Sequence, residues 1–269
     1  MRFICTACGT QFADGDAPPP ACPICEDDRQ YVRWGGQTWT TLAELAATHA
    51  LTFGEEGDGI TGIEMTPAFA INQRPLLLQS AAGNVLCDCC TVLTGAAVAE
   101  VKLRGGLTAI AISHPHYYST MLEWSAAFGD VPIHIHADDR QWVMRGGPAI
   151  HHWSGETLSI NDAMTLIRCG GHFPGGQVLH FAAAEGGKGA LFTGDIAMVA
   201  RDRRHVSFMY SFPNYIPLNA KAVRRIAAAV EPFAFDAIYG AWTGLNVKGG
   251  GKAAFAASVA RYVRAIGTG

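Results

Sequence analysis

Four cysteines near the N-terminus have the spacing of a metal site. They form two C-x-x-C pairs, Cys5 with Cys8 and Cys22 with Cys25. Each C-x-x-C turn directs two thiolates toward one point, so four sulfurs at about 2.3 Å can surround one tetrahedral zinc ion. Such a site leaves no open position for a substrate, and its binding free energy helps to fold a segment with few apolar residues. The pattern predicts a structural zinc site, with iron and electron transfer as the alternative.

A second group of metal-binding residue types follows apolar runs further along the chain. His114 and His116 directly follow one such run. Pro115 favours extended backbone at His114, and residues two apart in an extended segment point the same way. His172 lies in a glycine-rich loop, and Asp195 ends another apolar run. Because imidazole nitrogens and carboxylate oxygens are ordinary zinc ligands, these four residues are candidates for a second metal site.

The elements that must position these residues are short strands and amphipathic helices. Apolar runs bounded by turn residues predict strands over 75–79, 84–88, 107–113, 131–137, 163–169, 177–183, 190–195 and 206–211. Helical patterns are present over 39–49, 92–103, 121–128, 138–144, 220–230 and 253–266. Mixed sheets covered by helices, an α+β class, are expected.

The histidines and Asp195, taken with the strands before them, resemble the metallo-β-lactamase superfamily over residues 61–269. The resemblance implies an αββα sandwich that holds metal at the strand ends between two sheets. It also implies hydrolysis of esters, thioesters, amides or phosphodiesters. Asp88, which ends an earlier strand, matches the family's aspartate that orients the metal ligands from outside.

The cysteine pairs, within Phe3 to Gly9 and Cys22 to Cys25, resemble the knuckles of rubredoxins and zinc ribbons. We therefore expect three segments. Residues 1–33 form a rubredoxin-like knuckle, residues 34–60 a helical linker, and residues 61–269 the metallo-β-lactamase-like domain.

The sequence departs from the family pattern at the second metal position. The family signature is H-x-H-x-D-H, but Tyr118 and Ser119 stand where its aspartate and last histidine would be. A late histidine is also expected after the strand near residue 239, and the corresponding segment contains Trp242, which cannot bind a metal ion. Of the second ion's ligands only Asp195 is kept, so we infer one ion on His114, His116, His172 and Asp195.

These residues predict a mononuclear metal-dependent hydrolase of a small ester, thioester, lactone or amide-type substrate. Zinc would lower the pKa of a bound water toward ~7. Asp195 and Tyr118 are the predicted catalytic residues. Asp195 would bind the ion or accept the proton of the water, and the Tyr118 phenol would donate a hydrogen bond to a developing oxyanion.

Two alternatives stay open. Iron in place of zinc in the histidine site would give a mononuclear iron enzyme that acts on thiol-derived substrates. Loss of the second metal position is also compatible with a non-enzymatic metal-binding sensor or scaffold on the same fold.

Cys89 and Cys90 follow Asp88, so one of them could lie near the metal. The alternative is that both are buried structural thiols, as cysteines most often are. His134 and His136 are expected to lie outside the site.

Composition narrows the classes of partner. The 269 residues have a formal net charge of -3, which gives no general attraction to nucleic acid or to anionic membranes. Hydrophobic residues make up 49%, which excludes a disordered chain, yet no run reaches the ~20 apolar residues of a membrane span. We expect a cytoplasmic protein that has no disulfides and no signal peptide. We also expect its substrate to be a small molecule.

Overall fold

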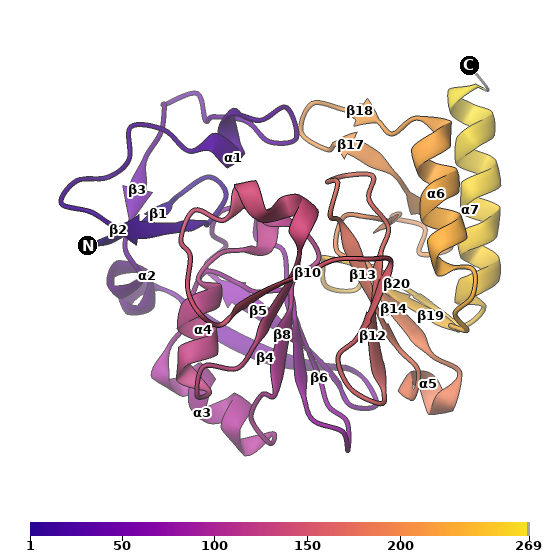
Figure 1. The fold of residues 1–269 in the computed structure, drawn as a ribbon, viewed down its shortest axis with the longest axis horizontal. Helices are drawn as coiled ribbons and strands as arrows, with labels where there is room; N and C mark the ends of the chain where they lie inside the picture. Colours follow the sequence, from indigo (N-terminus) through magenta and orange to yellow (C-terminus); the bar gives the residue numbers. More distant parts are fainter. Residues whose placement is uncertain (268–269) are drawn as a thin grey trace.

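Two facing sheets with helices on their outer sides make up most of the molecule (Figure 1). The computed structural model describes residues 1–267. One sheet has seven strands in the order β10-β9-β8-β7-β6-β5-β4, and the other has six in the order β11-β12-β13-β14-β19-β20. The α+β class and the αββα sandwich implied by the family resemblance are confirmed.

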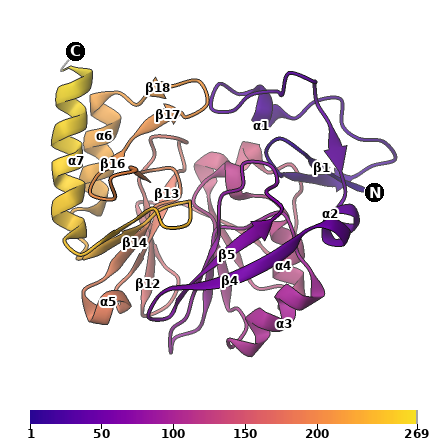
Figure 2. The same ribbon diagram turned by 180° about the vertical axis from the view of Figure 1, so that it is seen from behind.

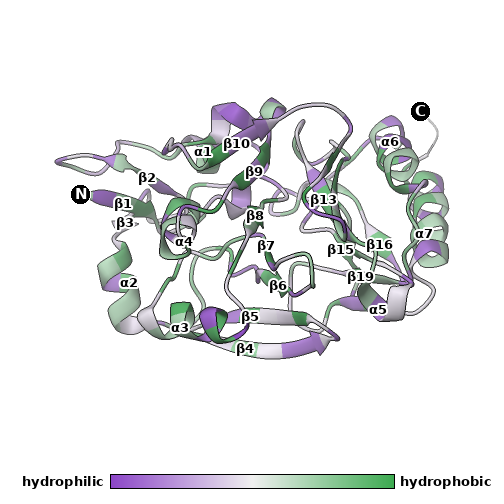
Figure 3. Ribbon diagram, turned by 60° about the horizontal axis from the view of Figure 1, so that its bottom comes forward, coloured by the Kyte–Doolittle hydropathy of each residue, from purple (hydrophilic) through white to green (hydrophobic). Residues whose placement is uncertain are grey.

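In the seven-stranded sheet the neighbours β7 to β10 run parallel, whereas β4 to β7 are antiparallel. Figure 3 shows the inner strand β8 as hydrophobic and the end of the edge strand β4 as hydrophilic, in accord with their places in the sheet. The strands are β4 Ala50–Gly57, β5 Ile60–Thr66, β6 Leu76–Leu78, β7 Val85–Cys87, β8 Ala109–Ala111, β9 Ile133–His136 and β10 Ile150–Trp153.

In the six-stranded sheet β14 and β19 run parallel and all other neighbours are antiparallel. Its strands are β11 Thr157–Ser159, β12 Met164–Arg168, β13 Gln177–Phe181, β14 Ala190–Phe192, β19 Ala237–Tyr239 and β20 Asn246–Lys248. Two small ladders stand apart from it, namely β15 Met198–Val199 with β16 Val206–Ser207 and β17 Met209–Ser211 with β18 Ile216–Pro217.

Both faces of the central strands are buried, which explains why β6, β7, β8, β13 and β14 have largely apolar sequences. Leu76 and Leu78 of β6 belong to the core between the sheets, where they join Leu166 and Phe192 of the opposite sheet. Leu77, between them in sequence, points the other way and packs under the outer helices. The two-residue period of a strand thus divides one apolar run between two cores.

Helices cover the two outer faces (Figure 2). Helices α3 Gly95–Leu103 and α4 Met121–Ala127 cover the seven-stranded sheet, and α6 Ala220–Val230 and α7 Gly251–Ile266 cover the six-stranded sheet. Val223, Ile226 and Val230 are buried on one side of α6 at the spacing of three and four residues that an amphipathic helix requires. A short helix, α5, spans Ala184–Gly187.

Several predicted elements change type or length. The segment 138–144 is a 3-10 helix over Ala137–Trp142 rather than an α-helix. The helix predicted from residue 92 begins at Gly95, because the Thr94 hydroxyl accepts a hydrogen bond from the Ala97 amide and caps it there. The strand over 206–211 is divided between β16 and β17. No strand was predicted for β4, β5, β10, β11, β15, β18 and β20.

The N-terminal segment lies at one end of the sandwich, beside the β17–β18 ladder (Figure 1). It consists of β1 Arg2–Cys5, β2 Gln11–Asp14 and a one-turn helix α1 Pro23–Glu26. Strand β3, Trp39–Thr40, completes its small sheet in the order β2-β1-β3.

The helical character predicted for residues 34–60 is wrong outside one helix. Helix α2, Leu42–Thr48, begins as expected at Thr41, whose capping box with Glu44 satisfies the first amides. β3, however, pairs with the knuckle, and β4 is the edge strand of the large sheet. No helix among residues 1–267 combines the length and the apolar character that a membrane span requires.

Candidate metal centre

The three predicted histidines and Asp195 come together in one buried cluster. One ligand atom from each side chain lies within 4.8 Å of every other. The centroids of the three imidazole rings are 5.1 Å apart in each pair. His172 Nε2 is 3.4 Å from His116 Nδ1, and His114 Nε2 is 3.4 Å from Asp195 Oδ2. The structure thus assembles all four predicted ligands.

Each ligand follows a strand end, so the sheets set the geometry. His114 follows β8 and caps the 3-10 helix Pro115–Tyr117, whose turn brings His116 back to the same side. His172 lies in the loop between β12 and β13 of the opposite sheet, and Asp195 follows β14. Strand β8 of one sheet and strands β12 and β14 of the other therefore deliver ligands to one end of the sandwich.

Unpartnered polar atoms show that the cluster fits a metal ion. Nε2 of His114, Nε2 of His116 and Oδ1 of Asp195 are buried and make no hydrogen bond. An orphaned buried polar atom costs about 1–3 kcal/mol, and several of them in one place need a common partner. Three imidazoles and one carboxylate form a donor set that suits zinc or iron.

Hydrogen bonds from outside the cluster orient two of the rings. His172 Nδ1 is 2.8 Å from the carbonyl oxygen of Tyr210, so Nδ1 donates and Nε2 faces the cluster as an acceptor. His114 Nδ1 is 2.8 Å from Ser113 Oγ. The Asp88 carboxylate accepts a hydrogen bond of 2.6 Å from the Ser113 amide. Asp88 therefore acts on the cluster through Ser113 and does not touch a ligand directly.

Gly194, in the T-G-D segment, allows Asp195 to approach this relay. Its φ of +49° lies in the left-handed region, and a Cβ there would stand 2.4 Å from Ser113 Oγ. Any larger residue would displace the hydroxyl that holds His114.

Burial keeps His116 and His172 neutral, as metal ligands must be. Desolvation lowers the pKa of His172 to about 3, and it also lowers the pKa of His116. Burial raises the pKa of Asp195, but the adjacent His114 and the hydrogen bond from Gln73 outweigh it, and the net pKa is below the usual value. At neutral pH these two imidazoles are therefore neutral and the Asp195 carboxylate is ionised.

Gln73 is the contact that sequence reasoning missed. Its Nε2 donates a hydrogen bond of 2.6 Å to Asp195 Oδ2, and both side chains are buried. Gln73 lies in the loop before β6 and precedes Asp195 by 122 residues, so no local motif signals the pair.

Asp139 was also not identified from the sequence. Its carboxylate accepts from the Gly175 amide at 2.8 Å, and burial raises its pKa to about 6.

The residues at the family's second metal position supply no ligand. The Tyr118 side chain packs in the core under α3 and α4, and its hydroxyl lies 3.5 Å from the backbone oxygen of Asp139. This geometry does not support the predicted hydrogen bond from Tyr118 to an oxyanion. Tyr117 is the tyrosine that packs against His114, with 5.3 Å between ring centroids. Ser119 Oγ is directed to the Cys89 carbonyl at 3.5 Å.

Other histidines and cysteines lie outside the four-residue cluster. His136 Nε2 is 3.2 Å from the Gly155 carbonyl, and His134 packs against His151. Cys89 and Cys90 are buried in the core beneath the helices. All eight cysteines, which fall within residues 1–267, are free thiols.

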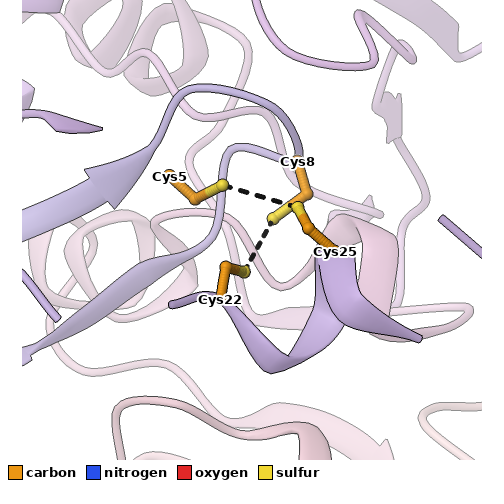
Figure 4. Close-up of side chains that lie close together, drawn as sticks. All are labelled: Cys5, Cys8, Cys22 and Cys25. Atoms are coloured by element: carbon orange, nitrogen blue, oxygen red, sulfur yellow. Dashed lines mark hydrogen bonds between the residues drawn. The ribbon is translucent and has the colours of Figure 1, made fainter. Parts of the chain in front are cut away.

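The four N-terminal cysteines form the second predicted centre (Figure 4). Cys5 Sγ lies 3.6 Å from Cys25 Sγ, and Cys8 Sγ lies 3.6 Å from Cys22 Sγ. Zn–S bonds of about 2.3 Å in a tetrahedron place sulfurs roughly 3.8 Å apart, so the spacing fits. Hydrogen bonds from Cys22 and the other thiols lower the pKa of Cys5, which then accepts from Gln37 Nε2 at 3.0 Å.

The knuckle contacts the histidine cluster through Arg29. The guanidinium donates to both carboxylate oxygens of Asp27 at 2.6 and 2.8 Å. Its remaining nitrogen donates to the His172 carbonyl oxygen at 3.3 Å, and its carbon lies 4.0 Å from the centroid of the Phe173 ring. The loop that carries His172 is therefore held from both sides, by Tyr210 and by the knuckle.

Comparisons with known proteins agree with this fold. The chain is 47% identical over 266 residues to the protein named "Uncharacterized protein YmaE" from Bacillus subtilis strain 168, a match that covers 98% of this chain and 96% of the relative. No protein-family model matches it.

Solved metallo-β-lactamases share the architecture at low sequence identity. FIM-1 from Pseudomonas aeruginosa in its mono-zinc form aligns with a TM-score of 0.58 at 15% identity, covering 80% of this chain and 96% of that one. A B3 metallo-β-lactamase with an active-site glutamic acid aligns with a TM-score of 0.55 at 17% identity, covering 83% of this chain and 92% of that one. VMB-1 aligns with a TM-score of 0.59 at 12% identity, covering 81% of this chain and 98% of that one. At these identities the likeness shows the fold alone.

Proposed function

The chain belongs to the family of the Bacillus subtilis protein YmaE, and on its metallo-β-lactamase fold we propose that it is a mononuclear metal-dependent hydrolase. The substrate class we propose is a small ester, thioester, lactone or amide. The observation that carries the proposal is the buried cluster of His114, His116, His172 and Asp195 with its unpartnered nitrogen and oxygen atoms.

The residues present divide the chemistry among them. A zinc ion bound by the three imidazoles would polarise a carbonyl group and lower the pKa of a coordinated water toward ~7. Asp195 is held by Gln73 at one oxygen, Oδ2, and its other oxygen, Oδ1, has no partner in the protein and would either bind the ion or accept a proton from the attacking water. Tyr210 holds the His172 ring and Ser113 holds the His114 ring, so these two histidines need no rearrangement during turnover.

The same geometry supports one ion rather than two. Asp195 Oδ2, the oxygen next to His114, already accepts a hydrogen bond from Gln73. Ser119 is directed to a carbonyl, the Tyr118 hydroxyl lies at Asp139, and Trp242 offers no ligand atom. Among residues 1–267 no further histidine, cysteine, aspartate or glutamate joins the four-residue cluster.

Metal analysis and a substrate panel test the proposal together. We expect two ions per chain, one in each cluster, and turnover of at least one ester, thioester or lactone. His116→Ala should remove one ion and abolish turnover, whereas His151→Gln, which alters an exposed histidine, should change neither. Iron in protein purified without added metal, together with oxidation of a thiol in place of hydrolysis, would contradict the proposal. Turnover that persists in His116→Ala would contradict it as well.

A further inference from the structure

A cavity of about 370 Å³ opens directly onto the histidine cluster, with His116 and Asp195 in its lining. We propose that this cavity, partly built by the knuckle, binds an uncharged apolar acyl group of the substrate. The inference rests on the proposed hydrolase function and adds the substrate class. The volume is near the lower end of the range for small-molecule sites, about 300–1,000 Å³, so a short acyl chain fits.

The knuckle supplies one wall of the cavity. Ala7, Arg29, Gln30 and Tyr31 all line it, and each comes from residues 1–33. Asn214 fastens this wall to the loop between β17 and β18, because its side-chain amide donates to the backbone oxygens of Asp28 at 2.8 Å and Gln30 at 3.2 Å.

The rest of the lining is largely apolar. It consists of Ala70, Ile71, Phe212, Pro213 and Trp242, together with His116 and Asp195 of the cluster. Trp242 stands where the family resemblance leads us to expect a metal-binding histidine, so it lines the cavity with an indole ring in place of a ligand. An apolar chain would bury its methylene groups against these rings and methyl groups.

Away from the metal cluster, the described residues that line the cavity offer no free cation to a charged substrate. Among them Arg29 is the positively charged one, and its guanidinium is already paired with both oxygens of Asp27 and with the His172 carbonyl. The other charged lining residue, Asp195, belongs to the metal cluster, where a bound ion would face the reacting carbonyl group and not the far end of the acyl chain. A carboxylate on the acyl chain would enter without a counter-ion, which is costly in a partly buried site.

A larger cavity of about 630 Å³ on the other side of Trp242 is a weaker candidate. It includes no metal ligand, and the exposed charges of Glu64 and Arg201 stand in its lining. A substrate confined there would not reach the cluster.

Acyl-chain selectivity tests the proposal. With zinc-loaded protein, kcat/KM for a thioester series should rise about fourfold for each added methylene from acetyl to hexanoyl, the effect of burying about one CH₂ group. Glutaryl thioester should be at least ~10-fold worse than hexanoyl. Tyr31→Ala should flatten the chain-length dependence. The matched control Tyr215→Ala changes an 85% exposed tyrosine outside the lining and should preserve the dependence.

A binding measurement separates this inference from the proposed function. Methyl pentyl ketone carries the apolar chain but cannot be hydrolysed, and its binding is followed by saturation-transfer NMR, with levulinate as the charged comparison. Ketone binding that is weakened by Tyr31→Ala and not by Tyr215→Ala supports the pocket even if no acyl compound is turned over. In that case only the hydrolase proposal fails. Hydrolysis without chain-length preference, or levulinate binding as tightly as the ketone, would overturn the inference.

Discussion

Replacement of Gln73 by leucine should weaken metal binding in the histidine cluster and leave the knuckle unchanged. Gln73 Nε2 donates a 2.6 Å hydrogen bond to the ionised carboxylate of Asp195, and both groups are buried. Leucine keeps a similar volume but removes the donor, so Asp195 loses the contact that fixes its orientation.

The size of the effect follows from the type of bond. A hydrogen bond to a charged group contributes about 1.5–3 kcal/mol. Loss of a partner of a metal ligand typically costs about 10–100-fold in metal affinity, which is about 1.4–2.8 kcal/mol. The two estimates agree, so we expect the dissociation constant for zinc at the cluster to rise by ~10–100-fold.

Competition with a chromophoric chelator measures that constant. We expect one ion in the knuckle and one in the cluster, and only the binding constant of the cluster should change in Gln73→Leu. Gln79→Leu is the matched control, because Gln79 lies in the same part of the chain and donates at 3.1 Å to the Arg104 carbonyl, far from any ligand. Equal zinc affinity in Gln73→Leu and the wild type would refute the reasoning that Gln73 holds Asp195.

Three further changes test the other parts of the site. Tyr118→Phe should retain the fold, the metal and, within about twofold, any turnover, because the phenol only reaches a carbonyl at 3.5 Å; a ~100-fold loss would restore the oxyanion role predicted from sequence. Gly194→Ala should lose zinc from the cluster, whereas Gly244→Ala, with φ of +73° and open space around it, should show only the ~1–2 kcal/mol cost of the left-handed backbone in thermal unfolding. Cys22→Ser should lose the knuckle ion and lower the melting temperature, while Cys169→Ser, a buried thiol outside both clusters, should keep both ions; an unchanged ion count in Cys22→Ser would contradict the knuckle site.

The metal ligands could be predicted because their signals are local. Each ligand follows a strand end or sits in a two-residue C-x-x-C turn, and the residue types are rare enough in such positions to stand out. Cys5, Cys8, Cys22 and Cys25 come together, as do His114 and the other three ligands of its cluster. The strands within 75–79 and 84–88 could also be predicted from sequence, because both faces of these strands are buried and their residues are therefore mostly apolar.

The contacts that tune the site could not be predicted, because they join residues far apart in sequence. Gln73 reaches Asp195 across 122 residues, and Arg29 reaches His172 across 143. Glutamine and arginine are common surface residues, so nothing in their types marks them as neighbours of a metal. The orientation of Tyr118 failed for a related reason. A residue that takes the place of a ligand in a motif need not point its side chain in the same direction. Burial of the Tyr118 ring in the core is favourable, because it removes apolar surface from water.

The position of the knuckle changes how its metal site should be understood. The sequence favoured a closed site with no chemistry, and four buried thiols support that part. The knuckle nevertheless contributes Arg29 to the loop that carries His172 and a wall to the cavity above the cluster. Removal of its metal should therefore do more than lower stability. As α1 and the Arg29 loop lose order, His172 loses the bond to its carbonyl oxygen and keeps the contacts of its ring with the Met209 and Tyr210 carbonyls, and the cavity loses one side. A structural ion at the N-terminus can thus control the affinity of the second centre without touching the substrate.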